Sequence, residues 1–117
     1  FNQNRSYSTE SFLHRLAGYI KYAVNNREGL ASLKDLAQAM NSTIEVVISG
    51  LEWWVADGKI TIQNSEEDLY RLEIRKQPAD DRIKDQRSNL LRYQLNEITA
   101  YQKFLANLPV DQINEML

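Results

Sequence analysis

One long helix is expected in the C-terminal part of this 117-residue chain. From Asp80 to Asn107 the sequence contains no Gly and no Pro, the residues that most often interrupt a helix. A helix of this length spans roughly 40 Å, which exceeds the width of a small domain. Part of it must therefore pack on the rest of the chain, on a second copy or on a neighbouring domain. We expect Pro109 to end this helix and residues 111–117 to form a last turn. Its apolar stripe comprises Leu91, Leu95, Ile98 and Leu105, flanked by Leu90, Tyr101 and Phe104.

Two shorter amphipathic helices are predicted in the N-terminal part of the chain. Ser8 and Thr9 are suitable N-cap residues for the first helix, and an Asn pair followed by Gly29 marks its end. Ser32 begins the second helix. In both segments apolar residues recur at spacings of three and four, so each helix has one apolar face. These faces comprise Phe12, Leu13, Leu16, Ile20, Ala23 and Val24, and then Leu33, Leu36, Ala37 and Met40.

A third helix is predicted over residues 44–56. Ser42 and Glu45 have the spacing of a capping box, in which the Ser side chain accepts a hydrogen bond from the amide three residues on and the Glu reaches back. Asp57 and Gly58 end the helix, because Gly tolerates the left-handed conformation that follows a last turn. The core stripe comprises Ile44, Val47, Ile48, Leu51 and Val55, with Trp54 at its edge.

A β-hairpin is predicted after the third helix. Apolar and polar residues alternate over residues 60–62 and again over residues 69–74, and the polar residues 63–68 are expected to form the connecting loop. Three helices followed by a hairpin, with a tight turn between the second and third helices, is the element order of a winged-helix domain.

We therefore predict a mainly α, α+β fold with a winged-helix core over residues 1–77. Pro78 interrupts the chain after the hairpin, and residues 78–117 are expected to form the long helix, packed on the core or on a partner. An α+β domain of another topology is the alternative.

The composition argues against a catalytic centre. Without Cys the chain has no disulfide, no Cys-based zinc site and no thiol nucleophile, which also suits a cytoplasmic protein. The single His14 has no acidic pair at a spacing that would complete a site with it, and residues 66–68 lack the EF-hand pattern. No apolar run approaches the roughly 20 residues that span a bilayer. We expect no catalytic residue, no metal, no cofactor and no membrane span.

The third helix is a poor match for duplex DNA. Groove and phosphate contacts use Arg, Lys, Asn and Gln side chains, whereas the outward side of this helix offers Glu45, Ser49 and Glu52. The hairpin tip adds Glu66, Glu67 and Asp68, and each carboxylate near a phosphate would repel it. We expect that the domain does not read duplex DNA in the usual winged-helix manner.

Basic residues concentrate after the hairpin tip instead. This run is the one part of the sequence suited to phosphate contacts, although Asp80, Asp81 and Asp85 could pair with some of its bases on a solvated helix. Its candidate nucleic-acid-binding residues are Arg71, Arg75, Lys76, Arg82, Lys84 and Arg87.

A second apolar strip lies on the third helix, nearly opposite its core stripe. At 100° per residue, Val46, Gly50 and Trp53 share this side, and an isolated surface helix should not expose a Trp there. Either the long helix folds back over the strip, or the strip docks another domain or protein, since aromatic residues dominate such sites.

Three stretches carry a family resemblance. Residues 12–23, 50–60 and 95–104 read FLHRLAGYIKYA, GLEWWVADGKI and LNEITAYQKF. They resemble the C-terminal extension of cyanobacterial RecJ-type single-stranded-DNA-specific exonucleases. None of the three is a catalytic motif.

The resemblance implies a metal-dependent 5′-to-3′ exonuclease of DNA repair as the parent protein. Its active site would lie upstream, in a DHH-type phosphoesterase domain, and the present sequence contains no Asp-His-His. The chain begins without Met, which fits a piece of a longer protein. The segment would then be an accessory module that holds single-stranded DNA, packs against the catalytic domain or recruits another protein.

Two other function classes remain open from the sequence. A transcriptional regulator would combine a winged helix with a dimerising long helix, and would need basic residues on the third helix. A pure protein-interaction module would bind no DNA, and would lose its partner when Trp53 is replaced by Ala.

Overall fold

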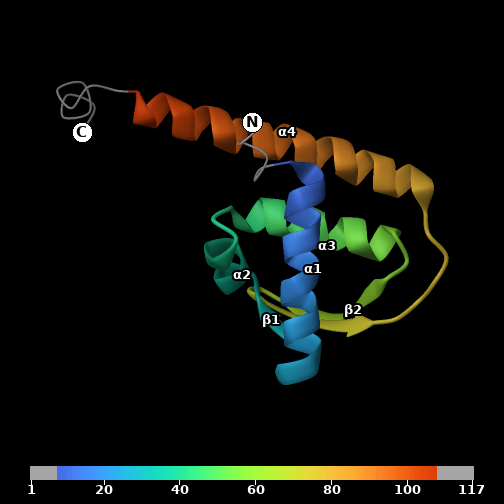
Figure 1. The fold of residues 1–117 in the computed structure, drawn as a ribbon. Coiled ribbons are helices and arrows are strands. Elements are labelled where there is room, and N and C mark those ends of the chain that lie inside the picture. The colour runs from blue at the N-terminus through green and yellow to red at the C-terminus, as the bar shows by residue number, and fades with distance from the viewer. Residues whose placement is uncertain (1–7, 108–117) are drawn as a thin grey trace.

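The computed structural model describes residues 8–107 as four helices and one three-stranded antiparallel sheet (Figure 1). This mainly helical α+β architecture agrees with the predicted fold class. The expected helix end at Pro109 and the turn over residues 111–117 lie outside the described residues. In chain order the elements are α1 (Thr9–Asn26), β1 (Leu30–Ser32), α2 (Leu33–Ala39), α3 (Ile44–Ala56), β2 (Ile60–Glu66), β3 (Leu69–Ile74) and α4 (Asp81–Ala106).

Side-chain caps fix the starts of the first three helices. Ser8 caps α1 and Ser32 caps α2, as predicted, because each side chain accepts a hydrogen bond from the amide three residues on. For α3 the predicted capping box is wrong by one residue. Thr43 is the N-cap, and its Oγ1 accepts from the amide of Val46 at 3.3 Å. Ser42 belongs to the preceding turn, since its amide donates to the carbonyl oxygen of Ala37 at 2.8 Å.

The sheet has the order β1-β3-β2, with β3 in the centre. The strand β1 was not predicted, because three residues are too few to show alternation. Its register pairs Ala31 with Tyr70. Gly29 allows this approach: its φ is +84°, and a Cβ there would lie within 2.3 Å of the Leu72 carbonyl oxygen.

The hairpin between β2 and β3 is tighter than predicted, and the expected loop over residues 63–68 is wrong. After an irregularity between Ile62 and Asn64, β2 continues to Glu66, which pairs with Leu69. Only two residues connect the strands. Polar side chains are compatible with this part of β2 because residues 63–66 are exposed to solvent.

The core cluster contains residues of all four helices, α1 to α4, and of the three strands of the sheet. Of the predicted α3 stripe, Val47 and Leu51 are fully buried, whereas Ile44, Ile48 and Val55 are only partly buried. The largest fully buried side chains are Leu16, Met40, Val47, Leu51, Leu91 and Leu95.

The long helix α4 packs on α3 and extends beyond it (Figure 1). Leu91 and Leu95, on the side facing the core, are 0% and 1% exposed. At the start of α4, the amide of Asp80 donates to the carbonyl oxygen of Ala56 at 2.7 Å. Towards the other end of α4, Tyr101 and Phe104 are 63% and 51% exposed. Residues 8–107 thus cover part of α4 and leave its C-terminal turns exposed.

Candidate functional site

The side of α3 that bears Glu45, Ser49 and Glu52 packs against α4 of the same chain. Ser49 is buried, and only Glu45 among the three outward residues is exposed. The carboxylate oxygen Oε1 of Glu52 lies 2.8 Å from Nε of Arg87 on α4. Because a major groove must receive a helix along its exposed side, α4 closes this route of approach.

A second ion pair holds the start of α4 against the end of α3. Lys84 Nζ lies 2.7 Å from Asp57 Oδ1, and Lys59 Nζ lies 2.8 Å from Asp57 Oδ2. The same Lys84 nitrogen stands 5.2 Å from the centroid of the Trp53 ring, within reach of a cation–π interaction. Lys84 and Arg87 therefore pair with carboxylates of the same chain, and both residues are only partly exposed.

Both lysines affect the pKa of the Asp57 carboxyl. Burial acts to raise its pKa, but hydrogen bonds and charge attraction from Lys59 and Lys84 outweigh burial and lower the pKa below its ordinary value. A folded-state pKa below the unfolded one stabilises the fold at pH values above the unfolded pKa. This stabilisation is lost as the pH falls through the folded pKa.

We expect Asp57→Asn to lower the free energy of unfolding at pH 7 by on the order of 1 kcal/mol, because the pairs are partly screened by solvent. The difference from the wild type should shrink below about pH 4 as the wild-type carboxyl becomes protonated. Urea unfolding at pH 7, 5 and 3 measures this, with Glu66→Gln in exposed β2 as the control. If Asp57→Asn lowered the free energy of unfolding by the same amount at all three pH values, the ion pairs of Asp57 would not be the cause.

The strip on Val46, Gly50 and Trp53 is covered within the chain, but α4 does not cover it alone as one alternative predicted, because α1 lies against Gly50. Val46 is 2% exposed, and a Cβ on Gly50 would lie 2.6 Å from Cδ2 of Leu16 on α1. Trp53 is partly buried beside Lys84 of α4. The hypothesis that Val46 and Gly50 dock a partner is therefore wrong, because helices of the same chain cover them.

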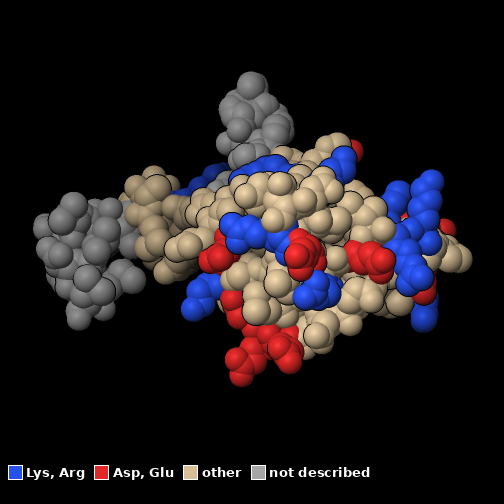
Figure 2. Space-filling view, turned by 90° about the horizontal axis from the view of Figure 1, so that it is seen from below, with Lys and Arg blue, Asp and Glu red and all other residues tan. Residues whose placement is uncertain are grey.

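Four of the six predicted basic residues remain on the surface. Arg75, Lys76 and Arg82 are exposed and have no ion-pair partner within residues 8–107, and Arg71 donates to the carbonyl oxygen of Glu28 at 2.9 Å. Figure 2 shows Lys and Arg gathered at the right-hand end of the molecule. The segment joining β3 to α4 lies at this same end in Figure 1.

The acidic hairpin tip divides into two parts. Glu66 and Glu67 are exposed, as predicted for a solvated tip. Asp68 instead ties the tip to α2, because its carboxylate accepts hydrogen bonds from Ser32 Oγ at 2.5 Å and from the Lys34 amide at 2.8 Å. Both hydrogen bonds lower the pKa of the Asp68 carboxyl, and the bond from Ser32 has the larger effect.

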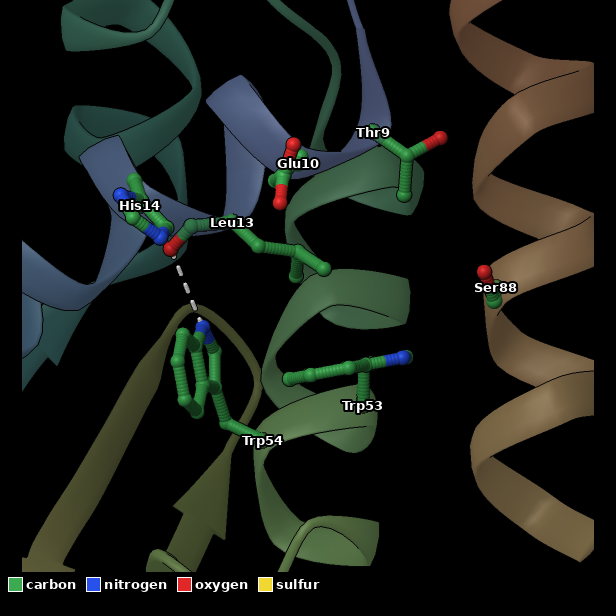
Figure 3. Close-up of a pocket in the computed structure, with 7 residues that line it drawn as sticks. All are labelled: Thr9, Glu10, Leu13, His14, Trp53, Trp54 and Ser88. Carbon is green, nitrogen blue, oxygen red and sulfur yellow. Dashed lines mark hydrogen bonds between the residues drawn. The ribbon is translucent and has the colours of Figure 1, made fainter. Parts of the chain in front are cut away.

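His14 borders a hollow of about 340 Å³ between α1, α3 and α4 (Figure 3). Beside it, Trp54 donates its indole N–H to the carbonyl oxygen of Leu13 at 3.2 Å, and the Trp53 ring stands at 87° to that of Trp54. Glu10 and Ser88 also line the hollow. No group of three or more metal-ligating side chains occurs in residues 8–107. The tryptophans here pack the helices together.

Sequence reasoning missed two exposed tyrosines on α1. Tyr19 is 36% exposed and Tyr22 is 54% exposed, and both lie on the side of α1 away from the core. Their spacing of three is a signal visible in the sequence, but it lies outside the apolar face from which the helix was predicted.

No protein-family model, no curated protein and no solved structure matches this chain. None of the helices in residues 8–107 has both the length and the apolar character needed to cross a bilayer.

Proposed function

We propose that this chain is a non-catalytic winged-helix accessory domain of a RecJ-like exonuclease, which positions single-stranded DNA for a catalytic domain elsewhere in the protein. The order α1-β1-α2-α3-β2-β3 and the short turn between α2 and α3 support the winged-helix assignment. The three stretches that resemble RecJ-type proteins support the parent activity.

The contact between α3 and α4 is the observation that most supports the proposed role in positioning a single strand. Leu91 and Leu95 are buried on that contact, and two ion pairs, Glu52–Arg87 and Asp57–Lys84, flank it. A regulator that reads duplex DNA would need this side of α3 exposed and basic. A domain that positions a flexible single strand needs only a groove or edge lined with cations.

The cations at the end formed by the β3–α4 connection suit that role. Arg75, Lys76 and Arg82 are exposed, lie within eight residues of sequence and have no ion-pair partner in the described part of the chain. Each neutralised phosphate releases condensed counterions, so binding through these residues would weaken steeply with added salt.

Fluorescence anisotropy of labelled single-stranded and duplex DNA across a salt series tests the proposal. We expect the chain to prefer the single strand, and we expect the triple variant Arg75→Glu, Lys76→Glu, Arg82→Glu to abolish that binding. A matched control reverses Lys34, Lys103 and Arg92, which are exposed elsewhere. Preference for duplex DNA, or no binding at low salt, would contradict the proposed function.

Protein docking is the second candidate, and the exposed apolar side chains at the C-terminal end of α4 favour it. Tyr101 and Leu105 border a hollow of about 550 Å³ together with Ser42 and Thr43 at the start of α3. Both apolar side chains are more than a third exposed, at 63% and 40%. A neighbouring domain of the parent protein could bury them.

A further inference from the structure

The exposed side of α1 combines cations with aromatic rings. From Ser11 to Arg27 the sequence contains Arg15, Lys21 and Arg27 but no Asp or Glu, in a chain of net charge −2. All three cations are exposed. This stretch is therefore a locally basic surface on an acidic protein.

Helical spacing places the rings on one strip with a cation. Arg15, Tyr19 and Tyr22 occupy positions i, i+4 and i+7, which share one side of a helix. Gly18 lies on the same strip, and a Cβ there would meet nothing within 4 Å. The missing side chain at Gly18 leaves the edges of the neighbouring rings open.

The two tyrosines stand between two hollows. On one side, Arg15 and Gly18 join the tyrosines in lining a hollow of about 500 Å³. On the other side, the tyrosines and Arg27 line a hollow of about 210 Å³ towards β1 and α2, where Asp35 is the one carboxylate. The larger hollow therefore lets a planar group approach the rings from the side of Arg15 and Gly18.

Cations stand beside these rings. The guanidinium carbon of Arg27 lies 5.9 Å from the centroid of the Tyr22 ring. Arg71 on β3 reaches the end of α1, where it donates to the Glu28 carbonyl oxygen. Arg71 thus links this surface of α1 to β3, the strand that leads to Arg75 and Lys76.

We propose that Tyr19 and Tyr22 form a stacking platform for unpaired bases of a single strand, whose phosphates contact Arg15, Lys21 and Arg27. Bases in a duplex have their faces covered by neighbouring base pairs, so only an unpaired base can stack on a side chain. Stacking on aromatic rings is tolerant of base sequence, because every base has a flat aromatic face. The inference rests on the proposed function and identifies where on the domain the strand would lie.

The test compares oligothymidine with an abasic strand of equal length, by anisotropy on the 117-residue chain at one low salt concentration. We expect the wild type to prefer oligothymidine. The variant Tyr19→Ala, Tyr22→Ala should bind oligothymidine at least about tenfold more weakly, the effect of one lost stack, and should bind the abasic strand unchanged. The variant Tyr19→Phe, Tyr22→Phe keeps both rings and should retain wild-type affinity.

The matched control is Tyr93→Ala, because Tyr93 is 62% exposed on α4, away from this surface. Circular dichroism verifies that each variant is folded. The proposed stacking on Tyr19 and Tyr22 is wrong if their double Ala variant loses no more affinity for oligothymidine than Tyr93→Ala does. It is also wrong if the wild type binds abasic and base-containing strands equally. If the wild-type chain binds no single strand at any salt concentration, the proposed function itself fails.

Discussion

Replacing Leu91 by Ala should lower the free energy of unfolding by about 2–5 kcal/mol, the range for a Leu→Ala change in a packed core. Leu91 is 0% exposed and lies in the core cluster with Val46, Val47 and Leu51 of α3. Because α4 is part of this core, removing the side chain should destabilise the whole domain. Urea unfolding followed by circular dichroism measures the change.

The matched control is Leu90→Ala, one position along the same helix. Leu90 is 38% exposed, so its replacement should cost about 1 kcal/mol or less. If Leu91→Ala and Leu90→Ala had the same small effect, α4 would not be packed on α3, and the side of α3 that faces it would be open.

Gly58→Ala should lower the free energy of unfolding by about 2–4 kcal/mol, through backbone strain together with a steric clash. Gly58 has φ of +77°, and a Cβ there would lie 2.0 Å from the carbonyl oxygen of Gln77. The chain leading into α4 would have to move away, with loss of the 2.9 Å bond from the Gln77 amide to the Gly58 carbonyl oxygen. Hydrogen exchange should therefore increase first at the Gln77 amide.

Gly18→Ala is the control for this prediction. Gly18 lies inside α1, and a Cβ there meets nothing within 4 Å, so Ala should stabilise the helix by about 0.5–1 kcal/mol. Equal and small effects of the two Gly→Ala changes would show that the connection from β3 to α4 does not pass close to Gly58.

Local signals in the sequence were enough to predict most elements. Ser8 and Ser32 have side chains that cap a helix without help from distant residues, and the start of each helix followed from them. The absence of Gly and Pro is also a local signal, and it predicted α4. Features set by distant contacts were missed. The strand β1 pairs with β3, and beside it the Leu72 amide donates a hydrogen bond to the Gly29 carbonyl oxygen across 43 residues of sequence.

The candidate site was predictable only in part, because charge along the sequence does not say which charges pair. Lys84 and Arg87 stood in a basic run, yet their partners, Asp57 at the C-cap of α3 and Glu52 within α3, lie more than 25 residues earlier. Gly50 shared a helical side with Trp53, yet α1 packs directly against it. Only the folded arrangement separates the cations that hold α4 from those left on the surface.

Cross-linking of a double-cysteine variant tests most directly the claim that α4 covers α3 of its own chain. The chain has no Cys, so Glu52→Cys with Arg87→Cys introduces a single reactive pair, and Glu67→Cys with Arg87→Cys is the distant control. With a short bismaleimide, the account predicts a cross-link within one chain for the first pair and none for the second. Cross-links between two chains, or no cross-link at Glu52 and Arg87, would contradict it.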